Sequence, residues 1–285
     1  MKVTIENFPF RDKFGDKRAF EMIKNAGFDG VDFSFNALDA DGNWGSIDLS
    51  NHLNTAKEQK KMLDDCGLSC TQAHAPFNVN KLGVKFNLND GFFADTIRSI
   101  EASSVLGVKT LVVHSLSVAV GDDFLGYNME FYKALESCAK DNGVKIAVEN
   151  LVNSIFWRPN RLSHFIRLLD SPVFCACIDV GHAFLMGIPP EKYISGMDKG
   201  VIECVHLHDT DSKVDRHWNP YQGDQNWENT MKALAEYGFN GDVNLEVIHS
   251  FDNLPDELYP AMLSYTATVG KYLKSLLEKY KGEIK

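Results

Sequence analysis

The chain repeats one pattern of hydrophobic and polar positions: an amphipathic helix, a glycine, and then a short apolar strand. Predicted helices over residues 17–26, 50–66, 90–106 and 127–142 end at Gly27, Gly67, Gly107 and Gly143, which lie 40, 40 and 36 residues apart. Glycine commonly ends a helix because it adopts a left-handed backbone without steric cost. In the first unit, apolar residues recur at helical spacing after Asp16, which is predicted to be the N-cap.

The strands complete the pattern and indicate the fold. They are predicted over residues 2–8, 30–35, 68–74, 108–114, 144–150, 174–182, 201–208 and 243–247, with further helices from Pro190, over 226–237 and after Pro255. Helical solenoids have periods of similar length, but here each unit contributes one strand and one helix, as in parallel βαβ units. A doubly wound sheet usually has fewer strands or a GxGxxG turn, which this sequence lacks. We therefore predict an α/β fold, a (β/α)8 TIM barrel that forms a single domain over residues 1–285.

Side chains alternate along a strand, so each strand has one inward and one outward face. The inward faces of the third to eighth strands end at polar side chains: His74, His114, Glu149, Asp179, His206 with His208, and Glu246. The outward faces are apolar and suit packing under helices. Active sites of TIM barrels lie at the carboxyl ends of the strands. These residues are therefore predicted to form the site, whereas Lys145, two inward-facing positions deeper than Glu149, is predicted to be a buried partner of a carboxylate.

Histidines concentrate in the same places. Of nine histidines, those at or just past a strand end are His74, His114, His182, His206, His208 and His249. Asp215 and His217 add a carboxylate and an imidazole after the seventh strand. A single histidine near a barrel mouth is as often a hydrogen-bonded residue as a ligand, but six successive strands that end this way favour a functional rim. Nitrogen and oxygen donors of this kind suit zinc, manganese or iron.

Aromatic residues follow several strands. Trp44, Trp157 and Trp218 fall in predicted loops, as do Phe8 and Phe10 after the first strand. Such rings can wall a pocket and contact a sugar, or they can pack loops together. For Trp157 we keep both interpretations, and Trp227, at the start of a helix, is predicted to be a packing residue.

Composition excludes several classes of protein. The formal net charge is −10 and no Lys/Arg cluster offsets it, which argues against a nucleic acid partner. No run of about 18 apolar residues is present, and the first residues lack a secretory pattern, so we expect a soluble, cytoplasmic protein without a membrane partner. The 6 cysteines include no CxxC pair and are expected to be reduced. The sequence is compatible with a homo-oligomer but does not fix its size.

Several motifs resemble those of the xylose isomerase-like TIM-barrel superfamily. They are HAPF at 74–77, EN at 149–150, DVGHAF at 179–184, HLHD at 206–209, DRH at 215–217 and LEV around Glu246. The resemblance covers the third to the eighth strand. The superfamily includes sugar and sugar phosphate isomerases and epimerases, dehydratases and metal-dependent apurinic endonucleases.

The resemblance implies a metal site. In the epimerase branch one divalent ion (Mn, Zn, Co or Mg) is held by four residues that match Glu149, Asp179, His206 and Glu246, and His182 matches a substrate contact. In the endonuclease branch a trinuclear zinc site adds residues that match His74, His114, His182, Asp215 and His217. Candidates for all nine positions are present. The run NPYQGDQNW after His217 departs from the proline-glycine-rich run of many isomerase-like members.

The expected function is a metal-dependent isomerase or epimerase of a small sugar, sugar phosphate or keto-polyol. Glu149 and Glu246 would be the catalytic acid and base around a metal-stabilised enediolate. His182, His74, His114, Trp157 and His208 are the predicted substrate contacts, and His182, Asp215 and His217 are predicted additional metal ligands. The alternatives are a dehydratase, an endonuclease-like phosphodiester hydrolase and a non-catalytic sugar-binding barrel.

Overall fold

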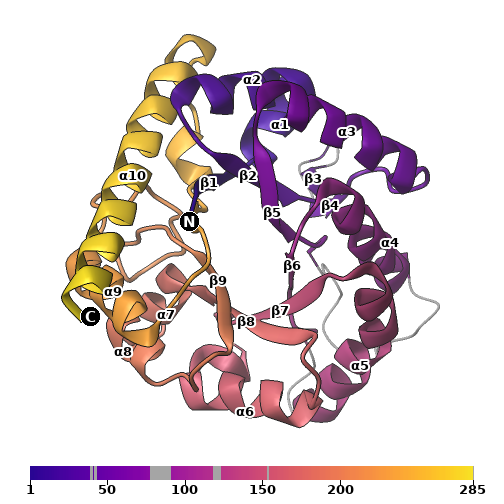
Figure 1. Cartoon of the computed structure of the whole chain (residues 1–285), viewed down its shortest axis with the longest axis vertical. Helices are drawn as coiled ribbons and strands as arrows, with labels where there is room; N and C mark the ends of the chain where they lie inside the picture. Colours follow the sequence, from indigo (N-terminus) through magenta and orange to yellow (C-terminus); the bar gives the residue numbers. More distant parts are fainter. Residues whose placement is uncertain (39–40, 42–43, 78–90, 118–122, 153, 285) are drawn as a thin grey trace.

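The computed structural model describes the chain except for residues 39–40, 42–43, 78–90, 118–122, 153 and 285. Eight parallel strands surround a common axis, and the helices lie outside them (Figure 1). In the sheet, the strands are ordered β10, β1, β2, β5, β6, β7, β8, β9. The remaining boundary, between β9 and β10, has a single parallel bridge from Leu207 to Leu245. The predicted (β/α)8 TIM barrel of one domain is therefore confirmed.

The strands are close to their predicted positions, although most are shorter at one or both ends. The eight barrel strands are β1 (Val3–Glu6), β2 (Gly30–Ser34), β5 (Ser69–His74), β6 (Thr110–Val113), β7 (Lys145–Glu149), β8 (Phe174–Asp179), β9 (Ile202–His206) and β10 (Val243–Leu245). A small antiparallel pair that the sequence pattern did not reveal, β3 (Asn36–Leu38) and β4 (Trp44–Ser46), follows β2.

The helices follow the strands. They are α1 (Phe8–Phe14), α2 (Asp16–Ala26), α3 (His52–Cys66), α4 (Gly91–Leu106), α5 (Phe124–Asn142), α6 (Pro159–Leu169), α7 (Val180–Leu185), α8 (Pro190–Ser195), α9 (Trp227–Tyr237) and α10 (Tyr259–Ile284). Three short 3-10 helices, η1 (Ile155–Trp157), η2 (Ile248–Phe251) and η3 (Asp256–Leu258), lie in connections. No helix in the described part of the chain is long and apolar enough to cross a membrane.

Three local predictions were wrong. The expected loop at Phe8 and Phe10 is helix α1, and Phe10 is buried against Phe251 at a ring distance of 4.7 Å instead of walling a pocket. Gly15, and not Asp16, is the N-cap of α2, and the Asp16 carboxylate accepts a hydrogen bond from Gln59 instead. Lys145 does pair with a carboxylate, Glu203, but both side chains are partly exposed, because Lys145 lies at the start of its strand.

Helix α6 shows why the glycine pattern was incomplete. It ends at Asp170, which takes the left-handed conformation (φ 46°) that glycine takes elsewhere. Aspartate tolerates this region better than most residues because its short side chain bonds locally. The predicted start of the third helix, Asp90, lies outside the described residues, and α4 is described from Gly91.

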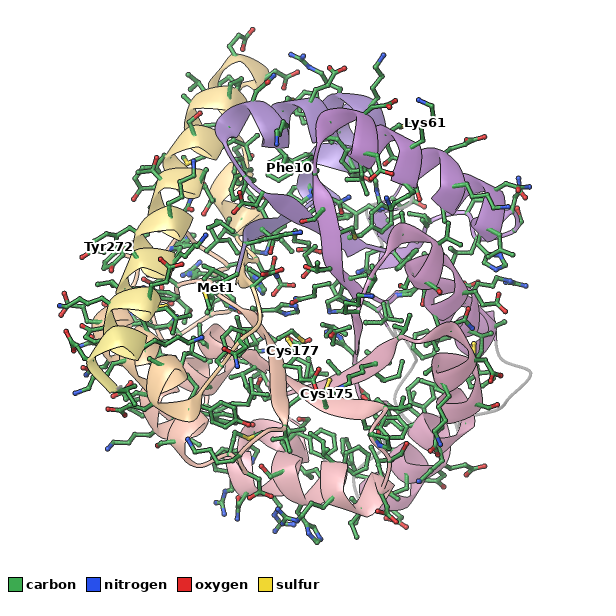
Figure 2. The ribbon with its side chains drawn as sticks, in the orientation of Figure 1. Met1, Phe10, Lys61, Cys175, Cys177 and Tyr272 are labelled. Carbon is green, nitrogen blue, oxygen red and sulfur yellow. The ribbon has the colours of Figure 1, made fainter. Side chains whose placement is uncertain are left out.

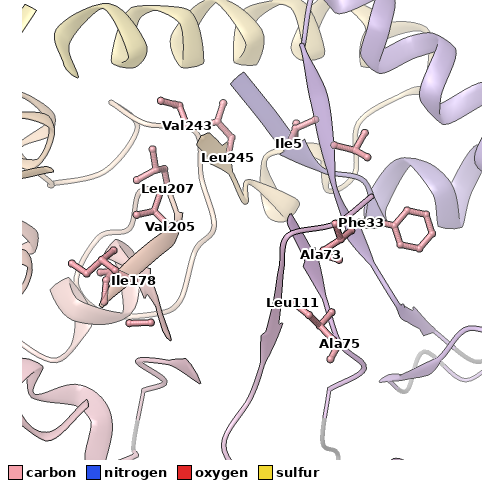
Figure 3. Packing of buried hydrophobic residues seen from close by; sticks show 14 of the residues in the cluster. Ile5, Phe33, Ala73, Ala75, Leu111, Ile178, Val205, Leu207, Val243 and Leu245 are labelled. Atoms are coloured by element: carbon pink, nitrogen blue, oxygen red, sulfur yellow. The ribbon is translucent and has the colours of Figure 1, made fainter. Parts of the chain in front are cut away.

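The outward faces of the strands form the main core with the helices, as the alternation predicted. Figure 3 shows Leu111, Ile178, Val205, Leu207, Val243 and Leu245 among these buried side chains. Helix α10 packs so closely on this layer that a Cβ on Gly270 would lie 2.5 Å from Val3. A separate apolar cluster lies in the lower half of the barrel interior, on β6 to β9: Val112, Ala147, Cys175, Cys177 and Cys204. Cys175 and Cys177 are labelled near the centre of the ring in Figure 2, and all six cysteines are unpaired, as expected.

Candidate metal centre

Four predicted ligands converge inside the upper end of the barrel. Glu149, Asp179, His206 and Glu246 each offer one atom, and these atoms all lie within 4.8 Å of one another. His206 Nδ1 is 3.2 Å from Glu149 Oε1, 3.1 Å from Glu246 Oε2 and 4.0 Å from Asp179 Oδ2. All four residues are buried. We name these four residues the central group.

The backbone of Asp179 is held by a neighbouring side chain. The Asn150 amide oxygen accepts from Asp179 N (2.7 Å), and the Asn150 amide nitrogen donates to Asp179 O (2.8 Å). Asp179 Oδ1 also caps helix α7, because it accepts from His182 N at 2.7 Å. The EN and DVGH motifs therefore position a carboxylate and an imidazole together. Only glycine fits at position 181, since a Cβ there would lie 2.0 Å from the His208 ring.

A second group lies on one side of Glu149. His114 Nε2 is 2.9 Å from Glu149 Oε2, His74 Nε2 is 3.5 Å from the same oxygen, and the two imidazole nitrogens are 3.1 Å apart. His74 Nδ1 contacts the carbonyl oxygen of Ala75 at 2.8 Å. Since a backbone carbonyl only accepts, Nδ1 donates, and Nε2 of His74 is directed at Glu149.

A third group lies on the other side, in and around the loop after β9. Asp215 Oδ2 is 3.1 Å from His182 Nε2 and 3.2 Å from His217 Nε2. His208 stacks on His217 at a ring distance of 3.9 Å, and its Nε2 is 2.9 Å from Asp179 Oδ1. His182, His208, Asp215 and His217 together form a further set of ligand atoms within 4.8 Å of one another. His217 has a left-handed backbone (φ 41°), a conformation that is uncommon for residues other than glycine but that histidine adopts more often than most.

The loop that holds Asp215 and His217 is organised by Asp209. The two carboxylate oxygens of this buried residue accept from Trp227 Nε1 (2.8 Å), Tyr221 N (2.9 Å) and Thr210 N (2.9 Å). The packing role predicted for Trp227 agrees with this arrangement, because its ring is buried and its nitrogen is bonded. Sequence reasoning did not assign a role to Asp209, although the HLHD motif contains it.

The charges of the cluster depend on one another. Burial alone would raise the pKa of Glu149, but the imidazoles of His206 and His114 lower it well below its usual range. The pKa of Glu246 is lowered in the same way, by His206 and His217. Burial lowers the pKa of His182, but Asp179 and Asp215 more than compensate and raise it to about 10. The Glu149 and Glu246 carboxylates are therefore ionised at neutral pH and are available as ligands.

Two buried acids below these groups were missed by sequence reasoning. Burial, with the charges of Glu246 and Asp32, raises the pKa of Glu6 to about 8, so this carboxyl is largely protonated at neutral pH. Asp32 Oδ2 lies 3.5 Å from His206 Nε2. Glu6 lies on β1 and Asp32 on β2, and neither strand contains a recognisable motif. The available signal was that both residues occupy inward-facing positions in the alternation of their strands.

Several buried polar atoms in the cluster make no hydrogen bond in the described part of the chain. They include Glu246 Oε2, His182 Nδ1 and Asp215 Oδ1. Buried polar atoms are rarely left unsatisfied unless an ion, water or ligand completes them. Nitrogen and carboxylate donors at these separations fit a divalent transition metal.

A cavity of about 400 Å³ opens above the cluster. Its lining is Phe77, His114, Glu149, Leu151, Val152, His182, Asp215, His217, Glu246, Ile248 and His249. His74, Asp179, His206 and His208 lie below it. Trp157, a predicted substrate contact, is on η1 and is not part of this lining; the Arg158 guanidinium lies 4.3 Å from its ring centre. Substrate contact by Trp157 stays a prediction.

Comparison with known sequences agrees with these motifs. The chain is 27% identical over 185 residues to the uncharacterized protein MJ1311 of Methanocaldococcus jannaschii. This match covers 61% of this chain and 62% of that protein. It is also 28% identical over 240 residues to a probable endonuclease 4 of Staphylococcus aureus, and this match covers 79% of this chain and 75% of that protein. The chain thus spans less than two thirds of the first of these relatives.

Solved structures have the same fold. A D-tagatose 3-epimerase-like protein matches over 100% of both chains with a TM-score of 0.76 and 21% identity. The IOLI protein with a bound zinc atom matches over 98% of this chain and 99% of its own, with a TM-score of 0.70 and 17% identity. The family described as xylose isomerase-like TIM barrel matches residues 20–265. This match, which covers most of the chain, shows that the chain belongs to the xylose isomerase-like TIM-barrel family.

Proposed function

We propose that the protein is a divalent-metal-dependent isomerase or epimerase of a small sugar. The main support is the convergence of Glu149, Asp179, His206 and Glu246 within 4.8 Å at the base of a cavity. These four residues would hold the ion. When bound, a divalent ion would polarise a substrate carbonyl and stabilise the negative charge that develops when a neighbouring proton is removed.

The two glutamates are suited to proton transfer on different sides of a substrate. Glu149 is the last residue of β7 and Glu246 directly follows β10, with β8 and β9 between these two strands in the barrel. Both line the cavity and both are ionised, so each can accept a proton from a carbon atom and return it as the conjugate acid. His182, which also lines the cavity, would orient a substrate oxygen.

The lining favours an unphosphorylated substrate. None of the described residues that line the cavity is Lys or Arg, whereas Glu149, Asp215 and Glu246 are acidic. In the described loop after β9, the Arg216 guanidinium binds Asp211 at 3.0 Å and 3.1 Å. Phosphate is normally bound by cationic side chains or helix N-termini. A neutral ketose or keto-polyol therefore fits this cavity better than a sugar phosphate.

Apolar side chains complete the lining. Phe77, Leu151, Val152 and Ile248 border the cavity beside the charged groups, and Phe77 stacks on the His114 ring at 4.8 Å. Such residues exclude water around a bound substrate and strengthen the electrostatic interactions below them. A reactive anion formed there would be protected from solvent.

Proton exchange tests this proposal directly. The protein is loaded with Mn²⁺, Co²⁺, Zn²⁺ or Mg²⁺ and incubated in D₂O with a panel of ketoses, each paired with its phosphate ester. We expect deuterium at a carbon next to the carbonyl of at least one free ketose, at a higher rate than for its phosphate. No exchange with any sugar under any metal would contradict the proposal.

A second function is favoured by a specific observation. The flanking groups, His74 with His114 and His182 with His208, Asp215 and His217, add ligand atoms on both sides of the central group. Several adjacent ions are typical of metal-dependent phosphodiester hydrolysis, in which they stabilise the attacking and leaving oxygens. The net charge of −10 and the lack of cations in the described lining disfavour a duplex substrate.

Metal stoichiometry distinguishes the two functions. Elemental analysis of the purified protein should give one tightly bound ion per chain if sugar chemistry is correct, and about three if the hydrolase is correct. Cleavage of an abasic-site oligonucleotide, together with an absence of sugar exchange, would establish the second function. Binding of sugar without exchange or cleavage would leave a sugar-binding barrel.

A further inference from the structure

A layer of polar side chains lies inside the barrel below the central group, on four neighbouring strands. Thr4, Asp32, Gln72 and Asn244 come from β1, β2, β5 and β10, and each is 4% exposed or less. They are paired across the sheet, since Thr4 is opposite Asn244 and Asp32 is opposite Gln72. A buried layer of this kind is costly unless its hydrogen bonds are satisfied, so the arrangement of its donors is informative.

The hydrogen bonds of this layer lead to Asp32. Thr4 Oγ1 lies 2.8 Å from Asn244 Oδ1, an acceptor, so the hydroxyl donates and fixes the orientation of the Asn244 amide. The Asn244 amide nitrogen then donates to Asp32 Oδ2 at 2.7 Å, and the Gln72 amide nitrogen donates to the same oxygen at 2.8 Å. Two donors on one carboxylate oxygen hold Asp32 in a fixed position.

Asp32 Oδ2 faces the far side of the His206 ring. The oxygen lies 3.5 Å from Nε2, a buried atom that makes no hydrogen bond in the described part of the chain. Nδ1, the other ring nitrogen, is 3.1–3.2 Å from Glu246 and Glu149. Neutral imidazole has one N–H and one lone pair, so a ring that binds metal through Nδ1 has its hydrogen on Nε2. A carboxylate beyond that hydrogen fixes the tautomer and makes the ligand nitrogen more basic.

We propose that Asp32 is a positioning residue for metal binding: its carboxylate accepts from Nε2–H of His206 and so directs the Nδ1 lone pair at the ion. This role rests on the proposed function in that it requires an ion at the central group. Thr4, Gln72 and Asn244 hold the Asp32 carboxylate. A purely structural role, in which Asp32 only satisfies the two amides, is the alternative.

The substitution Asp32→Asn separates these roles. The asparagine oxygen can still accept from Gln72 and Asn244, so the packing of the layer is retained, but the negative charge beyond His206 is lost. Zinc affinity is measured by competition with a chromophoric chelator. Loss of such an outer carboxylate typically weakens metal affinity by about 10–100-fold, which is the expected result.

Asp242→Asn is the matched control. Asp242 also accepts two hydrogen bonds, from Lys2 N (2.7 Å) and Thr71 Oγ1 (2.6 Å), but it contacts no residue of the central group. Its zinc affinity should equal that of the wild type. Equal affinity of Asp32→Asn and wild type, with circular dichroism showing both folded, would overturn the proposal while leaving the proposed function intact.

A measurement on the wild type is independent of whether the variant folds. In the zinc-loaded protein, long-range ¹H–¹⁵N correlation spectra of the His206 ring should show hydrogen on Nε2 and zinc on Nδ1. Hydrogen on Nδ1 would overturn the proposal. If zinc causes no change at His206 at all, the metal site of the proposed function fails, and the Asp32 role fails with it.

Discussion

The interior of the barrel has two halves with opposite chemistry. The upper half contains the central group, its flanking histidines, Glu6 and the Asp32 layer, with several unsatisfied polar atoms. The lower half contains the small apolar cluster of Val112, Ala147, Cys175, Cys177 and Cys204. Consecutive inward positions of the same strands contribute to both, as Cys204 and His206 do on β9. On β6 to β9, two residues along a strand thus separate packing from chemistry.

The difference shows what each half contributes. Apolar side chains in the lower half contribute stability without specificity, because burial of nonpolar surface is favourable in any close-packed arrangement. The upper half costs stability, since buried ionisable groups are expensive unless each finds a partner. Its arrangement is therefore explained by function and not by folding. Substitutions in the two halves should affect different measurements.

The largest effect is expected from Glu246→Gln in the upper half. The amide can still offer an oxygen to the ion, but it cannot accept a proton. Turnover of an exchanging ketose should fall by about 10²–10⁴-fold, the usual effect of losing a general base, with little change in unfolding temperature. Glu101→Gln is the control. Among the described ion pairs, Glu101 takes part in one only, with His52 on the outer surface. Equal losses in both variants would contradict a catalytic role for Glu246.

Metal removal should destabilise the protein through the upper half alone. An ion that binds the native state at 100 times its dissociation constant adds about 2.7 kcal/mol to the free energy of unfolding. Dialysis against a chelator should therefore lower the urea midpoint, and added Zn²⁺ should restore it in a concentration-dependent way. A midpoint that does not respond to either treatment would indicate that no ion binds here.

The pKa of Glu6 predicts a pH effect on the metal-free protein. Its folded pKa is about 8 against an ordinary value of 4.5, so the native state keeps a proton that the unfolded chain loses. Stability from this group falls as pH rises from 4.5 to about 8. Glu6→Gln removes this loss, so its advantage over the wild type should grow by about 1.4 kcal/mol for each pH unit across that range. Urea titrations at several pH values measure it, and a constant difference would refute the shift.

The smallest effect is expected in the lower half. Val112→Thr keeps the shape of a fully buried side chain but places a hydroxyl in an apolar cluster. The free energy of unfolding should fall by about 1–3 kcal/mol. Zinc affinity and turnover should not change, and a loss of either would show that the two halves are not independent.

Much of the barrel was predictable because period and alternation are local properties of the chain. The outward face of β6 and β7, with Leu111, Val113, Ile146 and Val148, was read directly from the sequence and lies in the core. Helix α1 was missed because its seven residues contain Pro9 and too short an apolar pattern to be distinguished from a loop. Helix α6 was missed because its end at Asp170 lacks glycine.

The part of the site that lies at the strand ends was predictable from the sequence. The positions of His74, His114, Glu149, Asp179, His206 and Glu246 followed from strand ends, and the structure brings them together. Asp32 and Asp209 were not assigned roles, because their importance depends on partners 174 and 18 residues away, His206 and Trp227. Such contacts are set by the closure of the barrel and leave no local pattern. The assignment of each ligand to an ion stays a prediction.

The weakly bonded boundary between β9 and β10 has a consequence for how a bound ion would be detected. The single bridge between Leu207 and Leu245 consists of two backbone hydrogen bonds, from Leu207 N to Asn244 O and from Glu246 N to Leu207 O. His206 and Glu246 lie on either side of this seam. An ion bound by both side chains would link residues separated by 40 positions in the chain. It would do so at the boundary where the two strands share only one backbone bridge. Amide exchange at Leu207 and Glu246 would then report ion occupancy more sensitively than exchange at any other strand pair.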